Sequence, residues 1–142
     1  MRSREKLSFK AIFIGWFLIA NLLSAVLNLL IRYAAELILG AQGYDSRQAG
    51  DLLADAMDYR AFELCWEWVF TGLGGYAAAR LAGREEMRHA RRVGSLNAVG
   101  GVVFLIIATV FFPGIAPGGH VISILGSVPA AMAGGYMRRR QV

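Results

Sequence analysis

The sequence predicts an all-α fold, a four-helix transmembrane bundle in which residues 1–142 form a single membrane domain. Of the 142 residues, 56% are hydrophobic, which is more than a soluble domain of this size can cover with polar surface. The stretch from Val93 to Met137 contains no Asp, Glu, Lys or Arg, whereas a soluble helix needs a charged face. Lys and Arg gather in three segments of the sequence. If the chain crosses a membrane four times, these three segments lie on the same side of it.

Four apolar stretches define the expected spans, which cover about 9–31, 62–82, 93–112 and 120–137. Each approaches the ~20 residues that a helix needs to cross a bilayer core. The first stretch is too long for the apolar region of a cleaved signal peptide, so we expect it to remain as a span. Its helix is expected to continue through Tyr33–Leu39 and to end near Gly40–Gly43. Pro113 and Pro117, with their neighbouring glycines, predict a tight turn between the last two spans.

The segment 44–60 is rich in acidic residues and is expected to lie outside the membrane as an amphipathic helix. Asp45 or Ser46 can cap its N-terminus. One face at helical spacing is apolar, comprising Ala49, Leu52, Leu53, Ala56 and Met57. Such a helix either lies on the bilayer or the bundle or serves as a lid or a partner-binding element.

The distribution of basic residues predicts the orientation of the chain. Twelve of the fifteen Lys and Arg residues lie before residue 11, within Arg80–Arg92 or at 138–140. The remaining three, Arg32, Arg47 and Arg60, belong to the first outer loop, in which acidic residues outnumber basic ones. Because cytoplasmic loops carry the excess of Lys and Arg, both termini are expected to be cytoplasmic (N-in/C-in).

Small residues recur every four positions in two of the expected spans. These residues are Gly75, Ala79 and Gly83 in the second span, and Gly126, Ala130 and Gly134 in the fourth. Small residues let helix backbones approach closely in lipid, so both rows predict helix packing, within one chain or between protomers. The sequence Gly-Gly-Tyr occurs at 74–76 and again at 134–136, which suggests two parallel helical hairpin repeats.

Two carboxylates mark the main candidate site. Glu63 and Glu67 are four residues apart and share a helix face, and Glu67 lies about one turn inside the second span. An ionisable residue inside a span is a functional-site hypothesis by default. Arg32 is the expected partner of Glu67, with Glu36 and His120 at the same level. The group is either a structural ion pair or an outer-leaflet site for a cation, a proton or a lipid headgroup.

Other polar residues have simpler interpretations. Asn21, Asn28 and Asn97 are expected to form hydrogen bonds between helices, and a polar permeation path is the alternative. His89 is expected to be a solvated loop residue, and Cys65, the single cysteine, a buried and inert thiol.

The stretch Gly-Gly-Tyr-Ala-Ala-Ala-Arg-Leu-Ala-Gly at 74–83, followed by a basic loop with His89 and Ala90, resembles small bacterial four-helix inner-membrane proteins of uncharacterised function. The resemblance implies a multi-pass protein of the bacterial inner (plasma) membrane. It provides no catalytic residue to carry over.

The function expected from these patterns is that of a non-enzymatic structural component or partner subunit of a bacterial membrane. The alternative is a small oligomeric transporter or channel with an outer-leaflet polar site at Glu67. The sequence contains no nucleophile–base–acid set, no metal-ligand spacing and no phosphate-binding loop, so we expect no catalytic residue, metal or cofactor. The expected partners are the lipid bilayer and a second copy or another membrane protein. Nucleic acid is not expected, although the formal net charge is +5.

Overall fold

The computed structural model describes residues 8–83, 85–111 and 118–141, and all elements in these ranges are helices. Their bounds are α1 (Phe9–Phe13), η1 (Ile14–Leu23), α2 (Ser24–Ala41), α3 (Ser46–Asp55), α4 (Met57–Ala82), α5 (Glu86–Phe111) and α6 (Gly118–Arg139). The prediction of an all-α chain is confirmed for these residues. The first three elements follow one another without a break, so the first helix extends to Ala41 and ends where its sequence predicts. The expected turn at 113–117 lies outside the described residues.

Local sequence explains where several helices begin and end. The Ser8 hydroxyl accepts a hydrogen bond from the Ala11 amide and caps α1. Of the two predicted caps for α3, Asp45 is the one used, and it forms a capping box with Gln48. Gly83 ends α4 in the left-handed conformation, with φ of +64°. A Cβ on Gly83 would meet nothing within 4 Å, so this residue ends a helix and does not contribute to the predicted packing row.

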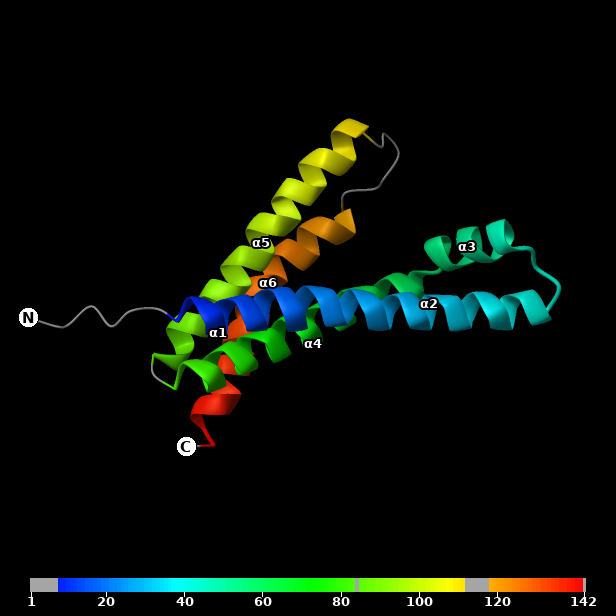
Figure 1. The fold of residues 1–142 in the computed structure, drawn as a ribbon. Coiled ribbons are helices and arrows are strands. Elements are labelled where there is room, and N and C mark those ends of the chain that lie inside the picture. The colour runs from blue at the N-terminus through cyan, green and yellow to red at the C-terminus, as the bar shows by residue number, and fades with distance from the viewer. Residues whose placement is uncertain (1–7, 84, 112–117, 142) are drawn as a thin grey trace, which may run out of the picture.

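The helices form two arms that cross and then diverge (Figure 1). One arm contains the continuous helix α1–η1–α2 together with α4, and the other contains α5 and α6. α6 packs chiefly against α4 and α5, while η1 packs against α4. α3 folds back against α2 and α4 at the far end of the first arm (Figure 1).

Glycines make the crossing of α4 with α6 possible. A Cβ on Gly75 would collide with the backbone of Ala131, and one on Gly134 with the carbonyl oxygen of Gly72. Backbones this close leave no space for a side chain, so each predicted row places one glycine at the crossing. The partners of these glycines, Ala131 and Gly72, lie outside the two rows. Ala79 in α4 is completely buried.

The other predicted packing residues of α6 also contact α4. A Cβ on Gly126 would collide with the indole of Trp68, and the carbonyl oxygen of Ala130 lies 3.2 Å from the position of a Gly72 Cβ. A further close contact, between η1 and α4, was not predicted. There Gly15 and Gly74 face each other, and a Cβ on either would collide with the carbonyl oxygen of the other.

The segment expected to be a basic loop, between α4 and α5, is more ordered than the sequence predicts. α5 begins at Glu86, so most of the expected basic loop is helical. His89 is therefore not a solvated loop residue, because only 3% of it is exposed. Its Nε2 accepts a hydrogen bond from the Ser8 amide at 2.9 Å, and its Nδ1 lies 3.1 Å from the carbonyl oxygen of Glu85. His89 thus ties the start of the first helix to the start of α5.

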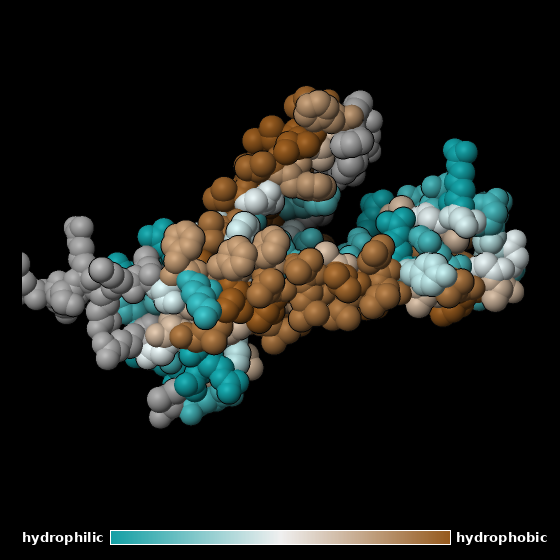
Figure 2. Space-filling model, viewed as in Figure 1, coloured by the Kyte–Doolittle hydropathy of each residue, from teal (hydrophilic) through white to brown (hydrophobic). Residues whose placement is uncertain are grey.

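Much of the outer surface is apolar (Figure 2). Two helices, Phe9–Ala41 and Glu86–Phe111, are long and apolar enough to cross a membrane, and only 17% of the most apolar window of each is buried. Apolar residues such as Leu29, Val110 and Leu125 are more than 65% exposed. Cys65 is also exposed, contrary to the prediction of a buried thiol. Exposed apolar surface of this extent marks contact with a membrane or another protein.

Replacing Gly75 with Leu is expected to destabilise the chain by about 1–3 kcal/mol, because the new side chain forces α4 and α6 apart. The measurement is thermal unfolding of the purified protein in a mild detergent. The matched control is Gly100→Leu in α5, where a Cβ would meet nothing within 4 Å. Equal melting temperatures for the two variants would show that the α4–α6 crossing is not a tight contact.

Candidate functional site

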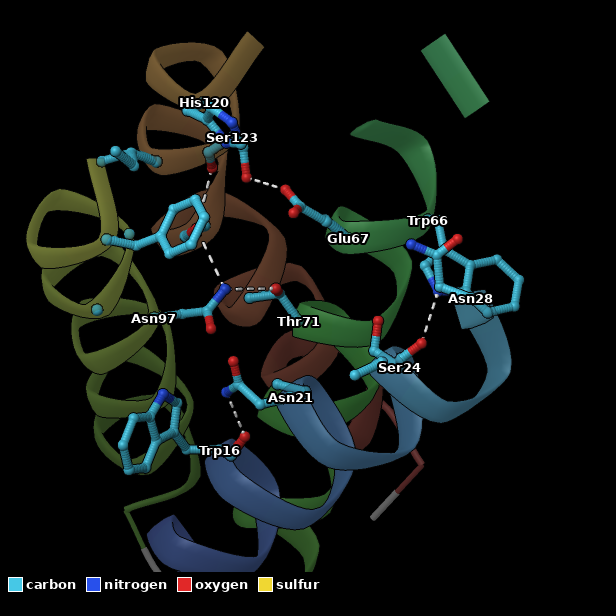
Figure 3. A pocket seen from close by; sticks show the side chains of 17 residues that line it. Trp16, Asn21, Ser24, Asn28, Trp66, Glu67, Thr71, Asn97, His120 and Ser123 are labelled. Atoms are coloured by element: carbon cyan, nitrogen blue, oxygen red, sulfur yellow. Dashed lines mark hydrogen bonds between the residues drawn. The ribbon is translucent and has the colours of Figure 1, made fainter. Parts of the chain in front are cut away.

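A cavity of about 440 Å³ lies between the two arms. Its polar lining comes from five helices and comprises Asn21, Ser24, Asn28, Glu67, Thr71, Asn97, His120, Ser123 and Ser127 (Figure 3). Three aromatic side chains, Trp16, Trp66 and Phe104, line it as well. Most of these residues stand singly in apolar stretches of the sequence, and the fold brings them together.

Glu67 extends from α4 toward α6, where the Ser123 hydroxyl donates a hydrogen bond to its carboxylate (Figure 3). The predicted ion pair between Glu67 and Arg32 is therefore wrong. Arg32 binds Glu36 on its own helix, with 3.0 Å between Nε and Oε1. The physical reason is that these two residues are one helical turn apart and lie beyond the cavity, where α2 extends past the crossing.

The candidate site residues thus separate into two groups. Glu67 and His120 line the cavity, whereas Arg32, Glu36 and Glu63 do not. The second group surrounds Tyr59 near the junction of α2 with α4. Burial raises the pKa of the Tyr59 hydroxyl, Glu63 and Glu36 raise it further, and Arg32 lowers it. These charges form a group separate from the cavity.

Asn97 links three helices at one wall of the cavity. Its side-chain amide donates to the Thr71 hydroxyl at 3.0 Å and to the Ser127 hydroxyl at 3.4 Å. Ser127 in turn donates to the carbonyl oxygen of Ser123 at 3.0 Å. Thr71 and Ser127 are almost completely buried, so this network fixes α4, α5 and α6 relative to one another.

The opposite wall is a π-helix of ten residues, η1. π-Helical segments are rare and occur frequently at functional sites. The Asn21 amide donates to the carbonyl oxygen of Trp16, five residues earlier, at 2.7 Å. Because a π-helix has more residues in each turn than an α-helix, Trp16 and Asn21, five residues apart, both line the cavity. Further along the same helix, the Trp66 indole of α4 donates to the carbonyl oxygen of Ser24 at 3.3 Å.

Two polar atoms of cavity residues are buried without a hydrogen-bond partner among the described residues. They are the indole nitrogen of Trp16 and the amide oxygen Oδ1 of Asn28. Leaving a buried donor or acceptor unsatisfied costs about 1–3 kcal/mol. Both atoms are closed off from solvent, while the polar cavity itself has room for water or a small ligand.

The charge of the lining is simple. Glu67 and His120 are its titratable residues, and no Lys or Arg is among the lining residues. Among the residues described, no group of three or more His, Cys, Asp or Glu side chains could hold a metal ion. The cavity therefore presents one carboxylate, one imidazole, several neutral hydrogen-bonding groups and the side chains of two tryptophans and a phenylalanine.

Comparisons with protein-family models, with curated proteins and with solved structures gave no match. The chemistry of the cavity therefore has to be inferred from its own residues.

The sequence contains a signal for the hydroxyl residues that sequence reasoning missed. Glu67 and Thr71 are four residues apart, as are Ser123 and Ser127, so each pair lies on one helix face. A shared polar face in each of two neighbouring apolar helices indicates that the faces meet. The cavity is completed by one face of η1 and one face of α5. Which faces these are depends on how the two arms cross, and no local sequence pattern predicts the crossing.

Thr71→Val and Asn97→Ala are each expected to destabilise the chain by about 1 kcal/mol, because hydrogen bonds between apolar helices have this size. Their effects should be less than additive, since both remove the Asn97–Thr71 bond and only Asn97→Ala also removes the bond to Ser127. Denaturation of the two single variants and the double variant measures this coupling. The control is Thr109→Val, because the Thr109 hydroxyl binds only the carbonyl oxygen of Leu105 in its own helix. Fully additive effects of Thr71→Val and Asn97→Ala would contradict the network.

Proposed function

We propose that this chain is a four-span protein of the bacterial inner membrane, of the transporter or channel class, whose cavity takes up a small polar solute from the outer side. The observation that carries the proposal is the polar cavity around Glu67, enclosed by helices whose outer surfaces are apolar. In a membrane protein, an ionisable side chain facing a cavity marks a substrate or ion pathway.

The lengths and sequences of α4 and α6 support two further spans. The expected spans 62–82 and 120–137 lie within these helices, which contain 26 and 22 residues. Both exceed the ~20 residues needed to cross the bilayer core. The charged residues of α6 are confined to its last turn, at Arg138 and Arg139. In α4, Glu63 belongs to the group around Tyr59 and Glu67 faces the cavity, so neither carboxylate has to face lipid.

The partner of Glu67 supports uptake of a solute over a purely structural role. A structural carboxylate in lipid is normally paired with a cation, but Glu67 binds a neutral serine hydroxyl. Its second carboxylate oxygen has no partner among the described residues and is available to a solute. The surrounding amides and hydroxyls provide the convergent polar groups that are typical of ligand sites.

A partner-subunit role is the second candidate, and a groove on another face favours it. The groove runs along α4 and α6, measures about 890 Å³ and is mostly apolar. Small residues line its floor, including Gly72, Ala130, Ala133 and Gly134. Such residues allow close approach of a further membrane helix, from a second copy or from another protein.

Accessibility of the cavity to water tests the main proposal. In a Cys65→Ser background, Asn97→Cys and Ser123→Cys are expected to react with a membrane-impermeant methanethiosulfonate added outside intact cells. The matched control is Val103→Cys, on the exposed apolar surface of α5, which should face lipid and react slowly. If the cavity cysteines react no faster than the cysteine at 103, the cavity is not a solute pathway from the outer side.

A further inference from the structure

We propose that the solute is a small organic ammonium ion, held in the cavity with Glu67 as its counter-charge. This inference rests on the proposed function, because it names the class of solute for the same cavity. Three features of the lining lead to it: its charge, its aromatic side chains and its volume.

The charge of the lining selects a cation over an anion. Glu67 supplies a carboxylate, and no Lys or Arg residue lines the cavity to balance it. An anion would meet the carboxylate at close range, with His120 as the one basic side chain of the lining. Hydrogen bonds between an ammonium N–H and a carboxylate are about twice as strong as neutral ones.

The aromatic residues indicate an organic cation. Trp16, Trp66 and Phe104 come from η1, α4 and α5, so they line the cavity from three of its helices. An ammonium group over an aromatic face within about 6 Å is attracted by the ring, and quaternary ammonium ligands are recognised in this way. Trp66 is fixed by ring contacts to Phe62 and Phe70, with centroid distances of 5.5 and 4.7 Å.

The volume and the ligand set argue against a bare metal ion. About 440 Å³ is within the usual range for small-molecule sites, and it greatly exceeds a desolvated ion. Calcium takes 6–8 oxygen ligands at 2.3–2.6 Å, whereas this lining has a single carboxylate. An organic ammonium ion satisfies both the charge and the apolar parts of the cavity.

Binding is tested on the full chain in lipid nanodiscs by thermal unfolding and tryptophan fluorescence, with tetramethylammonium chloride as the probe. A ligand that binds the folded state raises its melting temperature in a saturable way. We expect saturable stabilisation by tetramethylammonium and none by sodium chloride or by tert-butanol, a neutral molecule of similar size. Equal stabilisation by sodium would overturn the assignment to an organic cation. Equal stabilisation by tert-butanol would show that binding does not depend on the positive charge of the ligand.

Variants test the named residues. Glu67→Gln is expected to weaken tetramethylammonium binding at least tenfold. Glu63→Gln removes the same charge one turn earlier on the same helix, outside the cavity lining, and should change affinity less than twofold. Phe104→Leu, which leaves every polar group in place, should weaken binding several-fold and provides the test if Glu67→Gln does not fold. Unchanged affinity in either Glu67→Gln or Phe104→Leu would contradict the proposed site.

The two proposals can fail separately. If the cavity cysteines react from outside but tetramethylammonium shows no saturable binding, the ammonium assignment is wrong and the solute pathway remains. If those cysteines are unreactive and tetramethylammonium does not bind, both proposals are wrong.

Discussion

The backbone contact between α4 and α6 is the constraint on which the rest of the structure depends. At Gly75 and Gly134 the two helices are so close that a Cβ on either residue would strike the other backbone. This contact fixes where the arms cross; α5 then packs against both of these helices, and η1 packs against α4. Beyond the crossing the arms diverge (Figure 1), and their facing polar groups line the cavity. The small residues therefore position the site without belonging to it.

The polar residues between the arms follow from a second constraint, which is that buried hydrogen-bonding groups need partners. Asn97, Thr71 and Ser127 satisfy one another across three helices, and Asn21 binds the backbone opened by η1. Trp16 and Asn28 retain unpartnered atoms at the cavity. Unpartnered buried atoms also occur on Tyr59, Trp68 and Arg138, which do not line the cavity, so these atoms do not distinguish a solute site from a structural core. The solute-binding proposal rests instead on the position of Glu67 on the polar cavity.

Sequence patterns predicted features that depend on local chemistry. Periodicity and adjacent residues along the chain were enough to predict three features. These are the helical nature of the chain, the extension of the first helix to Ala41 and Asp45 as a candidate helix cap. The pairing of Glu67 could not be predicted in the same way, since it depends on which helix stands opposite α4. Arg32 was favoured for its charge, but its neighbour Glu36 lies one turn away on the same helix. Gly83 continued a four-residue spacing, yet a glycine just after a helix has a second use as a left-handed cap.

The central claim is that α6 crosses the bilayer with one face toward lipid and the other toward a polar cavity. A nitroxide scan along residues 120–137 in lipid nanodiscs tests it most directly, by comparing collision rates with oxygen and with a water-soluble nickel chelate. Labels on the Leu125 face should collide mainly with oxygen, and a label at Ser123, which is partly exposed on the cavity face, mainly with the chelate. High chelate collision rates at Leu125 and its neighbours on that face would show that α6 lies in water, and this result would contradict the account.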